Sequence, residues 1–465
     1  MTARKILPIL AFTLLGIAAL HDLSRLGDAL PWRRLYDFQD FYCAASAVEH
    51  RADPYRYEPL HGCEHRVNQT PAYREDPNRV IPAPIPPYDF PPLELAARLP
   101  FSLARGVDVA LIAAAVVAAI AGMASIGVAF DVAALALALP AGYLLLDAGQ
   151  IVPFALVALV YCGVALARRR DSIAGVLAAL TLIEPHLGLP VFLSVLLLVP
   201  RSRASAVATA LVLAIVGVLA VGGGGIVEYV GRVLPAQAAA ETHYLYQYSL
   251  TYLLAWIGLP ATFALIAGQI SYIAFAAVGL FLGAKLAGVL GRRELLAYLP
   301  AAFSIMGGAY VHMVDLSIAI PAALVLASTL TGRQRTVAAL ALALLAVPWI
   351  SVWITKKLFL AAIFVVGALL WRLRIGVAVA LATVCAIALT IYAFELAPPA
   401  PFSLMAATPS IAAGDLAQNA WRATVAAIDD PSPAWIFIKV PTWAALFALA
   451  GVSWSGSRRP PAGGA

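Results

Sequence analysis

Residues 37–48 have the sequence DFQDFYCAASAV, and residues 53–55 have the sequence DPY. Apolar side chains recur at positions 38, 41, 42, 45 and 48, which is the spacing of one face of a helix. The pattern predicts an amphipathic helix that lies on a membrane surface, with Asp37 and Asp40 on its polar face. A carboxylate held there can take a proton from a hydroxyl group.

The chain around this segment is strongly apolar. Its 465 residues are 62% hydrophobic and 12% charged, and the mean hydropathy is +0.87. These values are too apolar for a soluble globular protein of this length. Continuous apolar runs supply roughly 12 to 14 candidates for helices of about 20 residues, the length that crosses a bilayer. The sequence therefore predicts an all-α, polytopic membrane protein.

Basic residues are concentrated in short clusters between the apolar runs: residues 4–5, 168–170, 201–203, 292–293, 333–335, 372–374 and 458–459. Such clusters face the cytoplasm in membrane proteins. We expect both termini on that side of a bacterial inner membrane, with a single domain over residues 1–454 and a cytoplasmic tail at 455–465. Alternating helices then place a long loop, residues 21–105, and most of the unusual polar segments on the periplasmic side. Residues 355–357, Thr-Lys-Lys, are an exception, because this basic segment is placed on the periplasmic side.

The net charge of +6 is explained by these clusters. No basic patch with interleaved aromatic residues occurs, so we expect no nucleic-acid partner. The four cysteines lack metal-binding spacing. Cys162 and Cys385 lie in apolar runs and are expected to pack there. Cys43 and Cys63 lie in the long first loop, where they either form a disulfide in an oxidising periplasm or remain thiols.

The two acids of the first helix have two interpretations. In one, Asp37 is a general base whose pKa is raised by partial desolvation from its usual value of about 3.9, and Asp40 supports it. In the other, Asp37 caps the helix and Asp40 favours the positive end of the helix dipole. Arg33 and Arg34 precede the helix, and they either bind a lipid phosphate or anchor the chain at the interface beside Trp32.

Three further polar segments interrupt apolar sequence on the same side. Glu184 and His186 flank a proline, and they form either a site or a kinked outer loop. Residues 241–252 have the sequence ETHYLYQYSLTY, which suits the binding of sugar rings or an interfacial aromatic belt. An aromatic belt accounts for the tyrosines but not for three other polar residues: His243, Gln247 and Ser249. His312 either donates to a phosphate or sugar oxygen or lies in a simple loop.

Several motifs of other enzymes are absent from the sequence. No H-E-x-x-H motif, nucleotide-binding glycine motif or Asp-x-Asp cluster occurs, so a nucleotide sugar used in the cytoplasm finds no support. Polar groups on the outer face need a donor that is already there, and a lipid-phosphate sugar meets that need. We expect no metal cofactor, because Asp37 and Asp40 are a thin ligand set for magnesium. The donor phosphate is expected to contact cations of the outer face: Arg33, Arg34, His243, His312 or Lys356.

Four short motifs, taken in order, resemble those of glycosyltransferase family 87, the C-type integral-membrane transferases that use polyprenyl-phosphate sugars. The first-loop pattern acid-Phe-x-x-Phe/Tyr-Tyr-x-Ala-Ala, then Pro-Tyr, is matched at residues 37–45 and 54–55. A Tyr-Pro-Pro-like re-entry is similar to residues 90–92, and a Gly-Gln pair to residues 149–150. An Asn-Gln-Ser-Leu-like stretch resembles residues 247–250.

The resemblance implies a C-type glycosyltransferase fold and an inverting transfer of a mannose- or arabinose-like sugar. The donor would be a polyprenyl-phosphate sugar, and the acceptor a glycan or lipid-linked glycan at the periplasmic face, among membrane lipids. The resemblance also implies that Asp37 is the base, and it adds Tyr42, Tyr55 and Gln150 to the substrate-binding candidates. Glu184 departs from the family, many members of which have lysine before the proline, and the Asn-Gln-Ser motif is imperfect. A flippase of lipid-linked sugars and a catalytically inactive homologue are the alternatives.

Overall fold

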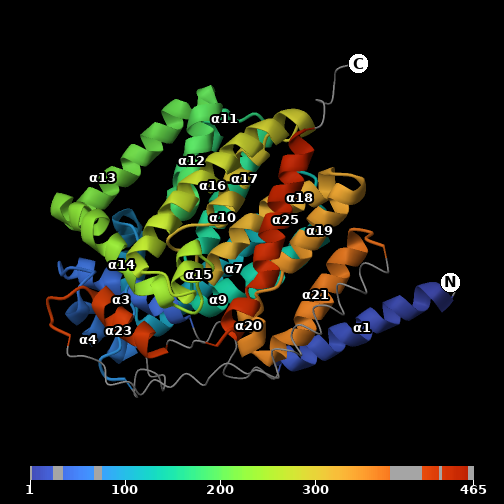
Figure 1. Ribbon diagram of the computed structural model, residues 1–465. Coiled ribbons are helices and arrows are strands. Elements are labelled where there is room, and N and C mark those ends of the chain that lie inside the picture. Colours follow the sequence, from blue (N-terminus) through green and yellow to red (C-terminus); the bar gives the residue numbers. More distant parts are fainter. Residues whose placement is uncertain (1–2, 25–34, 68–75, 377–410, 429–431, 459–465) are drawn as a thin grey trace.

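The computed structural model describes residues 3–24, 35–67, 76–376, 411–428 and 432–458, and within these ranges the chain is helical without any β-strand (Figure 1). The predicted all-α class is confirmed for this part of the chain. Two isolated β-bridges occur, Arg56 with Leu416 and Gln247 with His312. Each bridge joins segments that are far apart in the sequence.

Five helical segments are long and apolar enough to cross a bilayer: Phe101–Ser125, Phe130–Ala148, Pro200–His243, Ala261–Leu290 and Ala434–Ser457. Shorter apolar segments of 10–17 residues accompany them: Val152–Ala167, Asp171–Ile183, Pro185–Leu198, Leu295–Ser304, Met313–Thr329 and Phe359–Arg372. These lengths and compositions support a membrane protein. The number of crossings expected from the sequence stays a prediction.

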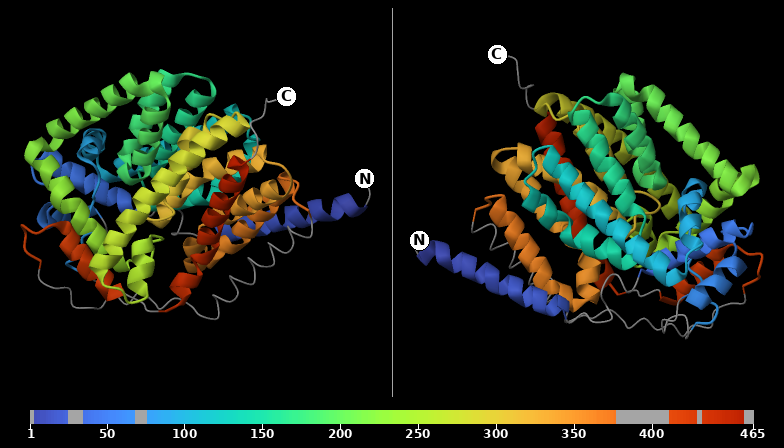
Figure 2. Two further views of the ribbon diagram at one scale, coloured as in Figure 1. Left: turned by 45° about the horizontal axis from the view of Figure 1, so that its top comes forward. Right: turned by 180° about the vertical axis from the view of Figure 1, so that it is seen from behind.

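Most helices pack into one bundle: α7 (Phe101–Ser125), α8 (Phe130–Leu137), α9 (Leu144–Ala148), α10 (Val152–Ala167), α11 (Asp171–Leu180), α12 (Pro185–Leu198), α13 (Arg203–Glu228), α14 (Leu234–Ala240), α15 (Leu250–Trp256), α16 (Ala261–Leu290), α17 (Leu295–Ser304), α18 (Ile320–Thr329), α19 (Gly332–Leu345), α20 (Trp349–Ile354), α21 (Phe359–Arg372), α24 (Ala434–Phe437) and α25 (Val440–Ser457). Helix α10 packs against α7 and α11, α16 against α17, and α19 against α18 and α25. Helix α1 (Ala3–Ser24) packs on α21 at the periphery (Figure 2).

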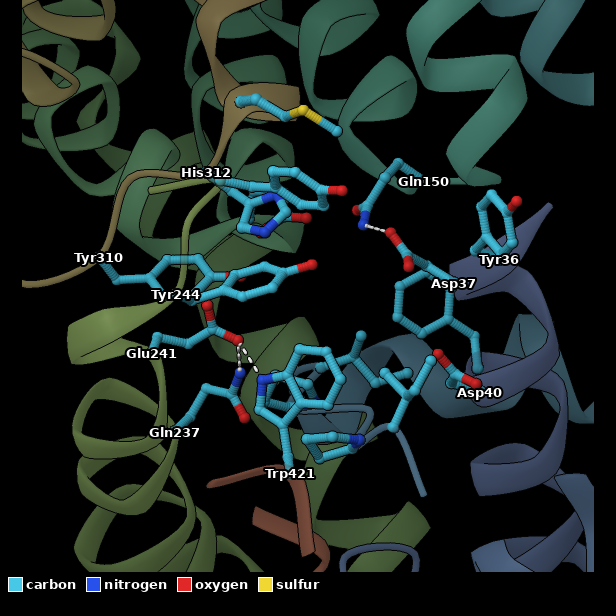
Figure 3. Close-up of a pocket in the computed structure, with 18 of the residues that line it drawn as sticks. Tyr36, Asp37, Asp40, Gln150, Gln237, Glu241, Tyr244, Tyr310, His312 and Trp421 are labelled. Atoms are coloured by element: carbon cyan, nitrogen blue, oxygen red, sulfur yellow. Dashed lines mark hydrogen bonds between the residues drawn. The ribbon is translucent and has the colours of Figure 1, made fainter. Parts of the chain in front are cut away.

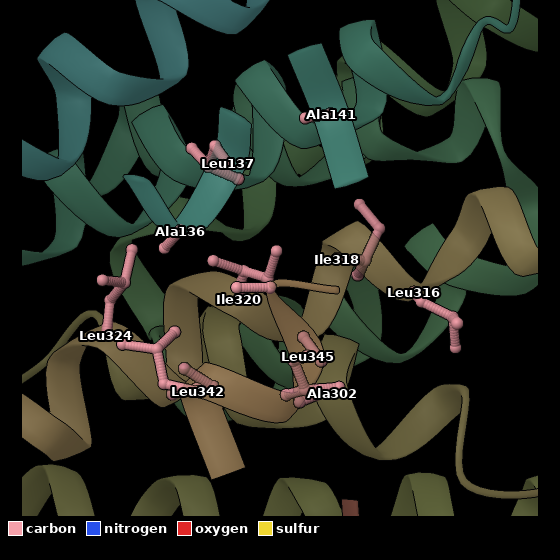
Figure 4. Packing of buried hydrophobic residues seen from close by; sticks show 14 of the residues in the cluster. Ala136, Leu137, Ala141, Ala302, Leu316, Ile318, Ile320, Leu324, Leu342 and Leu345 are labelled. Carbon is pink, nitrogen blue, oxygen red and sulfur yellow. The ribbon is translucent and has the colours of Figure 1, made fainter. Parts of the chain in front are cut away.

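Alanine, leucine and isoleucine side chains fill the centre of the bundle (Figure 4). Leu137, Ile320 and Leu342 are fully buried in this core. A Cβ atom on Gly163 would overlap the ring of Tyr298, whose hydroxyl donates to the carbonyl of Val160 at 2.8 Å. Small residues of this kind let helix backbones approach closely in an apolar environment.

A second group of helices covers one end of the bundle, and we call it the end layer: α3 (Tyr36–Glu49), α4 (Tyr57–Val67), α6 (Phe90–Ala97) and α23 (Ala417–Ile428) (Figure 1). Cys43 of α3 and Cys63 of α4 form a disulfide with their Cα atoms 5.6 Å apart, so the disulfide is the alternative that the structure contains. The backbone of Tyr57 donates to Asp415 at 2.8 Å, and Ala417 donates to Tyr55 at 2.9 Å. These bonds fix α23 beside the first loop.

Candidate functional site

A cavity of about 570 Å³ lies where the end layer meets the bundle (Figure 3). Its wall combines α3, the segment 79–86, the α9–α10 connection, the start of α12, α14 and α23. Six residues named from the sequence line it: Asp37, Asp40, Gln150, Glu184, His186 and His312. Gln247 and Tyr55 each donate a hydrogen bond to a lining residue. Residues separated by more than 200 positions therefore share one space.

Asp37 lies in the first turn of α3 and faces Gln150, whose side-chain Nε2 donates a hydrogen bond to Asp37 Oδ2 (Figure 3). Gly149 makes this approach possible. Its φ of +71° is in the left-handed region, and a Cβ there would lie 2.8 Å from the Cβ of Phe38. Glycine adopts this conformation readily, and it also leaves the space that α3 occupies.

The environment of Asp37 raises the pKa of its carboxyl group. Burial raises the pKa of Asp37 to about 6, the hydrogen bond from Gln150 opposes the rise, and the charge of Asp147 adds to it. A carboxyl group with this pKa is mostly ionised at neutral pH and remains basic enough to accept a proton. Asp37 does not cap the helix. The N-cap residue of α3 is Leu35, and no side-chain hydrogen bond is made there.

Asp40 has a different environment. It is 1% exposed, and neither carboxylate oxygen has a hydrogen-bond partner in the described part of the chain. Burial raises the pKa of Asp40 well above its usual value, and the nearby charges of Glu64 and Asp37 raise it further. The charge of Arg79 opposes these effects, and the net shift favours the neutral acid.

Glu241 holds the opposite side of the cavity from Asp37 (Figure 3). Its carboxylate accepts hydrogen bonds from Gln237 at 3.1 Å, Gln247 at 2.9 Å and Trp421 Nε1 at 2.5 Å. The side-chain oxygen of Gln247 accepts from the backbone of Val311 at 2.8 Å. Gln247 is fully buried and acts behind Glu241 instead of lining the cavity.

Aromatic rings form a large part of the same wall. Tyr244 stacks on His312 with centroids 5.3 Å apart and meets Trp421 edge-on at 5.2 Å. Tyr310 also stacks with His312, with centroids 6.0 Å apart. Rings beside carboxylates and amides offer both stacking faces and hydrogen-bonding groups, a combination that suits carbohydrate rings.

Glu184 and His186 lie at the start of α12, and His186 contacts Asp315 of the segment Met313–Ala319. The imidazole Nδ1 of His186 lies 3.6 Å from Glu184, and Nε2 lies 3.2 Å from Asp315. The backbone of His312 donates to the same Asp315 oxygen at 2.7 Å. The two carboxylates flank one imidazole, so the Glu-Pro-His segment is a connected polar group in contact with the cavity.

Five cations are expected at a donor phosphate, and the structure describes the side chains of two of them, His243 and His312. Arg33 and Arg34 lie outside the described residues, and His243 is exposed and does not line the cavity. Burial lowers the pKa of His312 to about 4, an effect that His186 and Lys439 strengthen and Asp315 opposes. His312 is thus a neutral hydrogen-bonding group. Among the described lining residues, Arg79 is the one arginine or lysine.

Three other predicted contact residues hold the architecture. Tyr42 donates to the carbonyl of Leu99 at 2.9 Å, and Tyr55 donates to that of Ile85 at 3.1 Å. Ser249 caps α15 by accepting from the backbone of Tyr252 at 3.1 Å. None of the three predicted residues lines the cavity. No cluster of three or more histidine, cysteine or acidic residues suitable for a metal ion occurs among residues that the structure describes.

Comparisons with known proteins found no matching family model, no matching curated protein and no matching solved structure. The class of protein is therefore described from the fold and the cavity alone. It is an all-α protein with apolar helices of membrane-crossing length and, at one end of the bundle, a cavity lined by acids and aromatic rings.

Proposed function

We propose that the protein is an inverting C-type glycosyltransferase that moves a sugar from a polyprenyl-phosphate donor to a hydroxyl group of a glycan or lipid-linked acceptor. The proposal rests on the position and environment of Asp37. This residue faces a cavity rich in aromatic rings, it is oriented by Gln150, and its pKa is raised to about 6. A carboxylate with a shifted pKa that faces a cavity is typical of a catalytic site.

The reaction assigns each group one task. Asp37 takes the proton of the acceptor hydroxyl as its oxygen attacks the anomeric carbon. The bond between that carbon and the phosphate oxygen breaks, and polyprenyl phosphate leaves with the electron pair. Arg79 stabilises the charge that develops on the phosphate, and neutral His312 is available to donate a hydrogen bond.

The sugar ring is proposed to lie against Tyr244 and Trp421, with its hydroxyl groups bound by Glu241. The three donors on Glu241 hold its carboxylate in one orientation, a requirement for selective binding of hydroxyl groups. Membrane lipid surrounds the apolar helices, so a lipid-linked donor reaches the cavity from the bilayer. Whether the sugar is a mannose or an arabinose is left to the assay.

The test uses protein purified into lipid nanodiscs and given polyprenyl-phosphate mannose or arabinofuranose, with a lipid-linked glycan acceptor extracted from the native membrane. We expect a product that is one sugar heavier from the native protein and none from Asp37→Asn. A parallel assay in sealed vesicles measures movement of the unreacted donor across the bilayer. Movement without transfer would favour the flippase, and neither transfer nor movement would favour an inactive homologue.

A further inference from the structure

A second cavity, of about 590 Å³, lies at the ends of α7, α10 and α16, and we call it the arginine cavity. Among the described residues, four arginines line it, Arg168, Arg169, Arg292 and Arg293, and one carboxylate does, Glu294. The first turn of α7 packs on α3 beside the catalytic end, as Phe101 stacks with Phe38 at 6.1 Å. A helix of 25 residues is about 37 Å long, so the arginine cavity lies at the opposite end of the bundle.

Two of the arginines are structural. Arg292 pairs with Glu294, which is 2% exposed, and donates to the carbonyl of Ile126 at 3.1 Å. Arg293 donates to Asp171 at 3.0 Å. These contacts join the α16–α17 turn to the end of α7 and the start of α11. The acidic groups nearby are therefore already neutralised.

The other two arginines have no such partner. No described residue accepts a hydrogen bond from the side chain of Arg168 or Arg169, and both residues are exposed where α10 ends. Their guanidinium groups add two positive charges to a cavity in which Glu294, the one carboxylate among the described lining residues, is paired with Arg292. A cavity with this excess charge is matched by an anion that accepts from arginine forks, as phosphate oxygens do.

The position of the cavity indicates which kind of molecule carries that anion. Helices α7 and α16 are candidate membrane spans that end at Ser125 and Leu290, so the arginine cavity is at the depth of lipid headgroups. Ile126, Ala167 and Ala287 form an apolar part of its wall. An anionic phospholipid offers both a phosphate for the arginines and glycerol and acyl groups for these apolar residues.

We propose that the arginine cavity binds the headgroup of an anionic phospholipid, with Arg168 and Arg169 contacting the phosphate. The site is separate from the catalytic cavity and does not depend on the glycosyltransferase proposal. The bound lipid fixes the ends of three helices and adds the partner that Arg168 and Arg169 lack among the residues that the structure describes.

The experiment measures retained lipid by native mass spectrometry after reconstitution in phosphatidylglycerol and phosphatidylcholine and release in detergent. We expect native protein to retain phosphatidylglycerol in preference to phosphatidylcholine, and the variant Arg168→Gln/Arg169→Gln to bind it roughly 10-fold more weakly. The matched control is Arg333→Gln/Arg374→Gln, which removes two exposed arginines outside the cavity. Equal retention by both double variants would overturn the proposal.

Two further arms keep the result decisive. A photoreactive phosphatidylglycerol added to native protein should label residues 125–126, 167–169 or 287–293, and labelling only elsewhere would contradict the proposed site even if the double variant failed to fold. Inorganic phosphate at millimolar concentration is the competitor. Displacement of the lipid by phosphate alone would assign the cavity to a soluble anion and overturn the phospholipid.

Discussion

Asp37 and Asp40 lie three residues apart on one helix, yet the structure gives them different chemistry. Both line the cavity, but Asp37 accepts a hydrogen bond from an amide, whereas Asp40 is buried near Glu64 and favours its neutral form. The difference follows from burial and neighbouring charge, not from residue type. In the proposed reaction, Asp37 is therefore the carboxylate that takes the proton of the acceptor hydroxyl group.

Replacing Asp37 by asparagine should abolish most of the transfer activity. Asparagine keeps the size and the bond to Gln150 but cannot accept a proton, so we expect kcat to fall by roughly 10²- to 10⁴-fold. Turnover of purified protein measures the loss, with the thermal midpoint as a check on folding. Asp40→Asn is the control and should cost much less, and a larger loss for Asp40→Asn than for Asp37→Asn would reverse the assignment.

The pH dependence of transfer should report the pKa of Asp37. The base works when deprotonated, and its pKa is raised to about 6, so kcat/KM should rise as pH increases through about 6 and level off above it. The measurement is kcat/KM from pH 4.5 to 8.5, a range set around that pKa. A flat profile below pH 6 would argue against a carboxylate base with this environment.

At the scale of the helices and their connections, the approach of α3 to the α9–α10 connection controls the site. Gly149→Ala should destabilise the protein by about 1–3 kcal/mol and reduce transfer, because alanine is strained at positive φ and its Cβ would clash with Phe38 and Leu35. Gly106→Ala in α7 is the matched control, since its Cβ would meet nothing within 4 Å. Equal thermal midpoints for the two variants would contradict the argument.

The disulfide between α3 and α4 stabilises the end layer. Cys43→Ser/Cys63→Ser should lower the free energy of unfolding by about 3 kcal/mol, because the closed loop spans 20 residues and the bond restricts the unfolded chain. Thermal unfolding with and without a reducing agent measures the effect. Reductant should shift the midpoint of the native protein but not that of the double variant, and an identical shift in both would point to another cause.

The sequence allowed some of these elements to be predicted and not others. The apolar spacing of residues 37–48 predicts α3, and the Gly-Gln pair is found beside Asp37. Glu241, Trp421 and Arg79 could not be assigned to the site, because tertiary packing brings together residues that have no sequence motif in common. Tyr42 and Ser249 were predicted as contacts, but their hydroxyl groups are used to hold backbone.

At the scale of the whole molecule, charge separates the two ends of the bundle. The cavity at the end layer is lined by acids and aromatic rings, and the arginine cavity at the other end is basic. Compact basic loops face the cytoplasm in membrane proteins, so the end layer is expected on the periplasmic side. The periplasm is also an oxidising environment, which suits the disulfide in the end layer.

Cysteine labelling of intact cells should therefore distinguish the two ends. His243 is exposed near the end layer, and Arg169 is exposed at the arginine cavity. A membrane-impermeant thiol reagent should label His243→Cys in intact cells and should label Arg169→Cys only after the cells are opened, because the bilayer blocks the reagent from the cytoplasmic end. The background chain carries Cys162→Ser and Cys385→Ser, while the disulfide blocks the other two cysteines. Labelling of Arg169→Cys but not His243→Cys in intact cells would invert the topology, and a lipid-phosphate sugar would then lose its main support as the donor.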